Sequence, residues 1–376
     1  MGAFAGLGTG AVSFAMERMA SDCARASSID PMTWRELNVL KRGDTCCGTT
    51  QKKAPPYSQL VAILEKASDF GRKYASFELI RKRRPDPSVP PGFGIGFAFG
   101  PQMGPGDFGK SDRDTPSVEL TMHTDSRLSI RTSVVPGSHT TPAIWRSIAS
   151  LSLGIPEKNI SVEQPCTDRV PDTGPATLSR SVAVVGTLLE AACTELASRR
   201  FREGLPISVK KMVRRRSSRS MPASPLEGAS WGAAAVEVEL DPVDASPQVR
   251  GIWVAARAGR LLSRTEAERA LEHDAFVAIS LCLAEYLDVS TASADDSDMR
   301  GYRLLRTKDA PPIHIDFVDD DSGPVGIGEL AYSLVPPAFA NAMTQALDSA
   351  WNFLPPVPGG QIVNVAARTV ADEAGG

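Results

Sequence analysis

The sequence predicts an α+β fold, because segments with helical periodicity and segments with strand periodicity are interspersed without a regular strand–helix–strand repeat. Apolar residues recur at helical spacing near the start of the chain, as in 14–23. Apolar runs of strand length follow in the middle, as in 233–240 and 249–255. With 376 residues, of which 42% are hydrophobic, the chain is long enough to bury a sizeable core.

The first ninety residues are predicted to be helical. Asp30 followed by Pro31 is an N-cap with a proline at the first helical position, which predicts a helix over 32–40. A longer helix is predicted over 57–80, and its basic end runs into a proline-rich connector at 85–91. We place a domain boundary at this connector. The chain is therefore expected to divide into a helical first domain and an α+β second domain, 1–90 and 91–376.

Strands and helices alternate after the connector. The predicted strands are 93–99, 117–122, 128–133, 160–163, 233–240, 249–255 and 312–318. The predicted helices are 142–153, 177–200, 265–287 and 336–353. Pro336 and Pro337 are expected to open the last helix, and the polar segment 202–229 is expected to be irregular.

The charge balance excludes a strongly basic nucleic-acid binder, because 41 Lys and Arg face 44 Asp and Glu, a formal net charge of −3. We interpret the arginine run at 214–219 as a solvated loop, with a phosphate or nucleic-acid contact as the alternative. No run of 18 apolar residues occurs, so no membrane span is predicted. No basic residue precedes the apolar start of the chain, so no signal peptide is expected and the predicted location is the cytoplasm.

Cysteine and histidine do not occur in a metal-binding pattern. The six cysteines include no CxxC pair, and the four histidines include no HxH or HxxxH pair. Cys46 and Cys47 are adjacent, so their side chains diverge. The sequence therefore predicts neither a zinc nor an iron–sulfur site from the ligands of this chain alone.

Two glycine-rich segments invite different interpretations. The glycines at 92–96 are spaced like a dinucleotide-binding fingerprint, but a strand continues after them where that motif needs a helix. We interpret them as a strand packed closely against another backbone. The second segment, 323–328, ends on the single carboxylate of Glu329. A buried carboxylate can serve as a general base, although a structural role is equally compatible with this pattern.

A third candidate is the start of the long helix predicted at 177–200, where Ser and Thr hydroxyls surround Arg180. Exposed backbone N–H groups and the helix dipole make such a terminus a natural anion site. Ordinary capping by Ser and Thr is the alternative.

The order of several motifs adds to these separate interpretations. They are FAMERM at 14–19, DP at 30–31, RELNVLKRGD at 35–44, LGIP at 153–156, TLSRS at 177–181, VEVELDP at 236–242, GIGEL at 326–330 and VPPAFANA at 335–342. In this order the chain resembles the C-terminal part of the molybdopterin-binding subunit of the xanthine dehydrogenase/aldehyde oxidase family. The resemblance covers nearly the whole chain. It implies the fold of the C-terminal molybdopterin-binding domains.

The resemblance also implies an activity, the hydroxylation of an N-heterocycle (xanthine- or nicotinate-like) or an aldehyde with water as the oxygen source. Glu329 matches the family's catalytic glutamate, which takes a proton from a hydroxyl on the metal. The pterin dithiolene holds the molybdenum, so no residue of this chain is implied as a metal ligand. The residues implied to bind the cofactor are Gly137, Ser138, Ser179, Arg180, Ser181, Gly326 and Gly328.

The resemblance implies partner chains as well. The sequence corresponds to one half of the usual subunit, as in the split medium subunit of nicotinate dehydrogenase. A large molybdopterin subunit would then complete the site. Electrons would leave through iron–sulfur and FAD centres on further subunits, and the pterin would carry a cytosine dinucleotide. Only a small-molecule substrate is implied beyond these partners, with neither nucleic acid nor a membrane.

Several positions depart from the family pattern. Glutamines of the family are replaced by Ala11, Ser138 and Ala270, and an arginine is replaced by Ala5. Glycines of the family are replaced by His273, Asp274 and Ser280. A side chain at a glycine position prevents close approach of the backbone. These changes support a second hypothesis, a non-catalytic or degenerate paralogue that has an assembly role.

Overall fold

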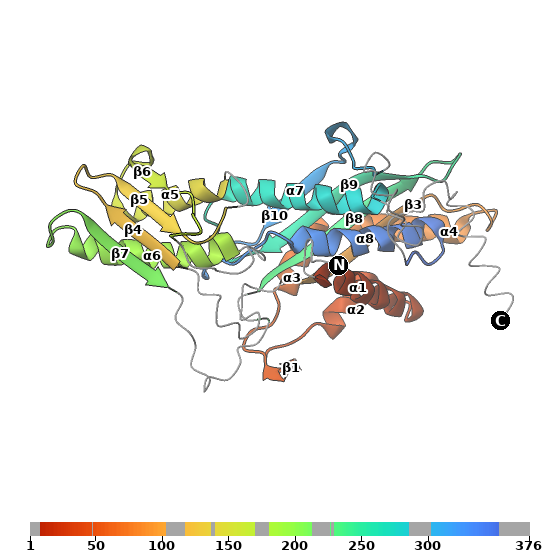
Figure 1. Ribbon diagram of the computed structural model, residues 1–376. Helices are drawn as coiled ribbons and strands as arrows, with labels where there is room; N and C mark the ends of the chain where they lie inside the picture. The colour runs from red at the N-terminus through yellow and green to blue at the C-terminus, as the bar shows by residue number, and fades with distance from the viewer. Residues whose placement is uncertain are drawn as a thin grey trace.

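The structure is a computed structural model, which describes residues 8–46, 48–102, 117–136, 140–169, 180–212, 226, 229–285 and 302–352. Helices and strands are mixed in it, and the predicted α+β class is confirmed. The molecule is elongated, with a smaller lobe at one end, built from 117–212, and a larger lobe that holds the other elements (Figure 1). The domain boundary near residue 90 stays a prediction.

A four-stranded sheet forms the centre of the larger lobe. Its strand order is β10-β9-β8-β3, in which β10 pairs parallel with β9 and the other neighbours are antiparallel. The four strands span Phe93–Gln102 (β3), Ser230–Leu240 (β8), Pro247–Arg257 (β9) and Ile313–Phe317 (β10). The strands predicted at 93–99, 233–240, 249–255 and 312–318 are therefore confirmed.

One face of this sheet packs against helices α7 (Arg264–Leu283) and α8 (Leu330–Leu347), as Figure 1 shows. Glycines of β3 allow α8 to approach the strand backbone. A Cβ atom at Gly94 would lie 2.0 Å from the carbonyl oxygen of Ala342, and one at Gly96 would lie 2.0 Å from that of Ala338. The interpretation of these glycines as a close backbone contact is confirmed.

Helix α8 begins at Leu330, so the prediction that Pro336 opens this helix was wrong. Both prolines lie inside the helix, where a proline normally leaves the carbonyl four residues earlier without its helical donor. For Pro337 that carbonyl belongs to Ser333, and the hydroxyl of Ser13 on helix α1 (Thr9–Ala26) donates to it at 2.8 Å. A tertiary contact thus replaces a missing helical hydrogen bond.

The opposite face of the sheet is covered by α3 (Tyr57–Ser68) and α4 (Phe70–Arg83). The sequence predicted one helix over 57–80. The helix breaks at Asp69, whose backbone is left-handed with φ of 56°. This break turns α4 away from the axis of α3, and Phe70 lies buried beside the Phe97 ring.

Helix α1 (Thr9–Ala26) lies next to α8, and α2 (Pro31–Asn38) packs against α1. The predicted cap is confirmed, because the Asp30 carboxylate accepts hydrogen bonds from the first backbone N–H groups of α2. The buried Arg18 donates to Asn341 on α8 at 2.5 Å, and Asn341 donates in turn to the carbonyl of Phe97 at 2.9 Å. Arg18 and Asn341 therefore connect helix α1, helix α8 and strand β3.

The smaller lobe has its own sheet, with strand order β6-β5-β4-β7, and helices α5 (Thr140–Leu153) and α6 (Arg180–Arg199) pack on it. Its strands span Ser117–Met122 (β4), Leu128–Thr132 (β5), Ile160–Val162 (β6) and Ile207–Met212 (β7). The prediction that 202–229 is irregular was wrong for β7. There, Ile207 and Val209 point into the core while the exposed polar residues Ser208 and Lys210 alternate with them.

The remaining regular elements are small. They are the strand pair β1 (Thr45–Cys46) and β2 (Thr49–Thr50), and the 3-10 turns at Glu157–Asn159 and Thr307–Asp309. Among the described residues, no helix is long and apolar enough to cross a membrane, and no cluster of three or more His, Cys, Asp or Glu could hold a metal ion. The arginine run at 214–219 and the tail after 352 lie outside the described residues.

Candidate functional site

Glu329 lies where the glycine-rich loop meets the N-terminus of α8. Its backbone N–H donates to the side-chain oxygen of Gln102 at 2.9 Å. Its carboxylate does not cap the helix, although an acidic residue at this position commonly does. The Oε2 atom is buried and has no hydrogen-bond partner within the described part of the chain. The carboxylate is therefore available to another group.

Two further polar side chains at this place are incompletely bonded. Gln102 and Ser230 pair directly across strands β3 and β8 and are 2% and 0% exposed. The Gln102 Nε2 and the Ser230 Oγ are buried and, among the described residues, lack hydrogen-bond partners. A buried polar atom that lacks a partner costs about 1–3 kcal/mol. Glu329, Gln102 and Ser230 each leave one such atom, and we take these three residues as the candidate site.

Asp274 on α7 reaches the same helix terminus from the other side. Its carboxylate accepts the backbone N–H of Tyr332 at 2.7 Å. Burial, with a smaller contribution from the negative charge of Glu329, raises the pKa of Asp274 to about 8. From the sequence, Asp274 was expected to prevent close approach of the backbone, because it replaces a glycine of the family. In the structure, its carboxyl group instead accepts a backbone hydrogen bond in the first turn of α8.

This pKa leads to a pH-dependent prediction. The folded state holds the Asp274 proton more tightly than the unfolded chain, whose carboxyl has the ordinary value of 3.8. The resulting stabilisation is fully present below about pH 4 and is lost progressively as the pH rises to about 8. Asp274→Asn keeps an oxygen acceptor for Tyr332 and removes this titration.

We therefore expect Asp274→Asn to become more stable relative to the wild type as the pH rises. Between pH 5 and pH 8, its unfolding free energy should gain a few kcal/mol over that of the wild type. Each pKa unit of difference corresponds to about 1.4 kcal/mol. Urea denaturation at both pH values measures it, and comparing variant with wild type at each pH cancels the other titrating groups. A constant difference would contradict this account of Asp274.

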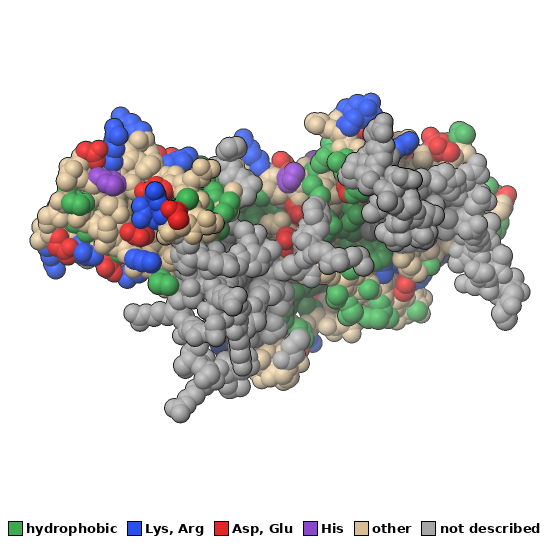
Figure 2. Space-filling model, in the orientation of Figure 1, with side chains coloured by type: hydrophobic (Ala, Val, Ile, Leu, Met, Phe, Trp, Pro, Cys, Tyr) green, Lys and Arg blue, Asp and Glu red, His purple; other side chains and the backbone are tan. Residues whose placement is uncertain are grey.

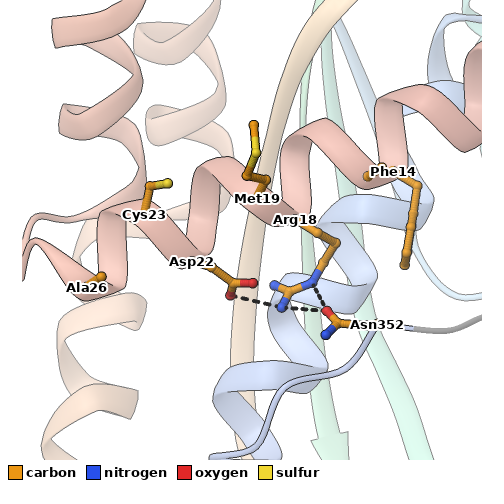
Figure 3. A pocket seen from close by; sticks show the side chains of 8 residues that line it. Phe14, Arg18, Met19, Asp22, Cys23, Ala26 and Asn352 are labelled. Carbon is orange, nitrogen blue, oxygen red and sulfur yellow. Dashed lines mark hydrogen bonds and ion pairs between the residues drawn. The ribbon is translucent and has the colours of Figure 1, made fainter.

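A separate hollow lies beside α1, with a volume of about 520 Å³ (Figure 3). It is lined by Phe14, Met19 and Cys23 and by the charged side chains of Arg18 and Asp22. The Arg18 guanidinium bonds to Asp22 at 3.0 Å and to Asn352 at 3.1 Å. Because the ionic groups are already paired, the hollow is mainly an apolar surface.

Comparison with known proteins tests the resemblance. Residues 71–205 match the family described as "Molybdopterin cofactor-binding domain". The chain is 25% identical over 122 residues to the isoquinoline 1-oxidoreductase subunit beta of Brevundimonas diminuta, and 24% identical over 129 residues to the membrane-bound aldehyde dehydrogenase [pyrroloquinoline-quinone] of Gluconacetobacter polyoxogenes. Its fold matches the crystal structure of a Cu,Mo-CO dehydrogenase with a TM-score of 0.77 and 14% identity. The resemblance to molybdopterin-binding subunits is confirmed.

The molybdopterin-binding fold is matched over nearly all of this chain but over only part of its relatives. The match to the Cu,Mo-CO dehydrogenase covers 97% of this chain and 53% of that chain. The matches to the two sequence relatives cover 34% and 32% of this chain, and 17% and 16% of theirs. The chain thus spans about half the length of the Cu,Mo-CO dehydrogenase chain that it matches.

The structure places the predicted cofactor-binding residues as follows. Gly326 is buried and Gly328 is exposed in the loop that leads to Glu329. Arg180 and Ser181 open helix α6, but their side chains are not described, and Gly137, Ser138 and Ser179 lie outside the described residues. The structure brings the loop glycines to Glu329. The cofactor roles of these residues and of Glu329 stay predictions.

Gln102 and Ser230 were missed by the sequence reasoning. The alternation along β3 carried a signal for Gln102, because Gly94, Gly96 and Gly100 share its face and that face packs on α8. A polar residue at the next position of this alternation meets the helix terminus. Ser230 carried no such signal, because its pairing with Gln102 is known only from the sheet.

Proposed function

We propose that this chain is the molybdopterin-binding subunit of a molybdenum hydroxylase that hydroxylates an N-heterocycle or an aldehyde, with water as the oxygen source. The buried, unpartnered carboxylate oxygen of Glu329 is the observation that carries the proposal. The names of two relatives, an isoquinoline oxidoreductase and an aldehyde dehydrogenase, support these two substrate classes. We further propose that the enzyme works in the cytoplasm.

The unpartnered atoms fit a bound polar group. Glu329 would act as the general base, accepting the proton that is released when the oxygen of water is transferred to the substrate. Burial of its Oε2 keeps bulk water from competing for this oxygen. The Gln102 amide and the Ser230 hydroxyl offer hydrogen-bond donors beside it, so together they can orient a polar group against the carboxylate.

When bound, the molybdopterin cofactor supplies the redox centre that takes up two electrons from the substrate. The residues of this chain that would hold it are Gly326 and Gly328 in the loop before Glu329, Arg180 and Ser181 at the start of α6, and Gly137, Ser138 and Ser179, which lie outside the described residues. Backbone N–H groups at the start of a helix suit the phosphates of a pterin dinucleotide, which we propose to be the cytosine form.

A large partner subunit would complete the site. The outer face of α1 carries Val12, Met16 and Met19, which are 64%, 54% and 54% exposed. In Figure 2, hydrophobic side chains gather over the part of the surface where α1 and α2 lie, whereas charged side chains cover much of the smaller lobe. An exposed apolar stripe of this kind, beside the hollow of Figure 3, is typical of a protein interface. Further subunits would carry the iron–sulfur and FAD centres.

One observation favours a second candidate function. The carboxyl group of Asp274 already occupies the N-terminus of α8, at a position where the family pattern has glycine. A negative or polar side chain there competes with a ligand for the same backbone N–H groups. The second candidate is therefore a non-catalytic or degenerate paralogue that serves in assembly.

Metal and nucleotide analysis of the purified complex separates the two candidates. We expect about one molybdenum per chain by mass spectrometry, and cytidine monophosphate released on acid hydrolysis of the pterin. The host must have a working molybdenum cofactor pathway, shown by a known molybdenum enzyme expressed in parallel. A folded complex without molybdenum in that host would contradict the proposed function and would support the assembly role.

A further inference from the structure

Two buried glutamines link strand β3 and helix α8 at opposite ends of their contact. Near the C-terminal end of α8, the Gln345 side-chain oxygen accepts the backbone N–H of Ile95 on the strand at 2.9 Å. Near its N-terminus the direction is reversed, because Gln102 on the strand accepts the backbone N–H of Glu329 at 2.9 Å. The two residues are equally buried, at 2% exposure each. Only Gln102 lies at the candidate site.

The backbone N–H groups in the first turn of α8 all have acceptors other than the Glu329 carboxylate. The Glu329 N–H donates to Gln102, and the Leu330 N–H donates to the carbonyl of Ile327 at 3.1 Å. Asp274 accepts from Ala331 and Tyr332. Helix termini usually satisfy these donors with the side chain of the capping residue itself. Here the capping residue is Glu329, and its side chain is left out of the cap.

The external cap therefore keeps the Glu329 carboxylate unengaged. Without the Gln102 oxygen, the Glu329 backbone N–H would be a buried donor in need of an acceptor. Such a donor can gain an acceptor in two ways. The start of α8 can shift, or the Glu329 carboxylate can fold back onto the helix terminus. Either change would move the carboxylate of Glu329 from its present place beside Gln102 and Ser230.

We propose that Gln102 is a positioning residue for Glu329, which holds the start of α8 so that the carboxylate of Glu329 stays free at the site. This inference rests on the proposed function for the role of Glu329. The hydrogen-bond geometry on which it depends belongs to the chain alone and does not need the cofactor.

Hydrogen exchange of the full chain, measured by mass spectrometry on peptides that cover 326–333, tests the first half of the inference. In Gln102→Met, which has a similar length and no acceptor oxygen, we expect exchange at the Glu329 amide to be roughly 5- to 10-fold faster, the size of a lost cap. Gln102→Glu retains an acceptor oxygen and should restore the protection. The matched control is Gln345→Met, which should accelerate exchange at Ile95 and leave Glu329 unchanged.

A second readout follows the carboxylate itself. The infrared band of the protonated Asp274 carboxyl, assigned by its loss in Asp274→Asn, reports how close the charge of Glu329 lies. In Glu329→Gln the pKa of Asp274 should fall, because a neighbouring negative charge is removed. In Gln102→Met the pKa should also differ from the wild-type value, falling where the carboxylate moves away and rising where it folds back onto the helix terminus beside Asp274, and in Gln345→Met it should stay as in the wild type.

Wild-type exchange at Glu329 together with a wild-type Asp274 titration in folded Gln102→Met would overturn the inference. Equal changes in Gln102→Met and Gln345→Met would also overturn it, because they would indicate general loosening of the contact. If Gln102→Met does not fold, the shorter Gln102→Asn, which cannot reach Glu329, takes its place with the same expected results. Absence of molybdenum from the complex would overturn the proposed function and leave these results unaffected.

Discussion

Replacing Glu329 with glutamine is expected to lower the turnover of the molybdenum-loaded complex by about a thousandfold, within the range that a general base contributes. Glutamine has nearly the same shape and cannot accept the proton. The fold should be unchanged, because the carboxylate takes no part in the helix cap and its Oε2 has no hydrogen-bond partner among the described residues. The measurement is the rate per molybdenum, with the thermal unfolding temperature as the test of folding.

Glu266→Gln is the matched control for this result. Glu266 lies in the first turn of α7 and pairs with the exposed Arg269 at 3.0 Å. We expect its loss of charge to leave the rate per molybdenum within about twofold, because a surface ion pair contributes little. Turnover that is equally high in Glu329→Gln and in the wild type would rule out the role assigned to Glu329.

The largest expected effect on stability comes from Gly96→Ala. A Cβ atom there would lie 2.0 Å from the carbonyl oxygen of Ala338 and 2.3 Å from the backbone nitrogen of Ala342. Backbone atoms of a buried helix cannot yield as a flexible side chain does, so α8 must move away from the sheet. We expect a loss of about 3 kcal/mol or more in the free energy of unfolding, measured by urea denaturation.

Gly100→Ala on the same strand is the control for this clash. Its Cβ atom would meet only a terminal methyl group of Leu334, at 3.4 Å. The expected loss is below about 1 kcal/mol, since the neighbouring side chain can adjust. Equal losses in the two variants would show that the glycines act through strand propensity and not through the close approach of α8. Because α8 begins next to Glu329, this approach also sets the position of the candidate base.

Local rules predicted the parts of the fold in which neighbours in sequence are neighbours in space. The Asp30 cap and the strand at 93–99 depend on residues a few positions apart, and both were predicted correctly. The start of α8 was not, because Pro336 and Pro337 normally open a helix. For Pro337, the missing helical hydrogen bond is replaced by one from the hydroxyl of Ser13, which is more than 300 positions away.

The candidate site was predictable to a similar extent. Glu329 was found from its place after a glycine-rich loop and from the order of the motifs around it. Gln102 and Ser230 were not found, because only the pairing of β3 with β8 brings them together. Asp274 could be identified as a departure from a glycine. Its contact with Tyr332 depends on how α7 packs against α8, which no local pattern encodes.

The proposal that Glu329 is the base of a cofactor site shared with a second polypeptide can be tested with a structure of the loaded complex. Electron cryomicroscopy of the complex purified with its molybdenum should resolve the Glu329 side chain. We expect its carboxylate to face the metal inside a cavity bounded by both polypeptides. The Gln102 side-chain oxygen should still accept the hydrogen bond from the Glu329 backbone N–H. A Glu329 side chain that faces bulk solvent, away from any cavity shared with the second chain, would contradict it.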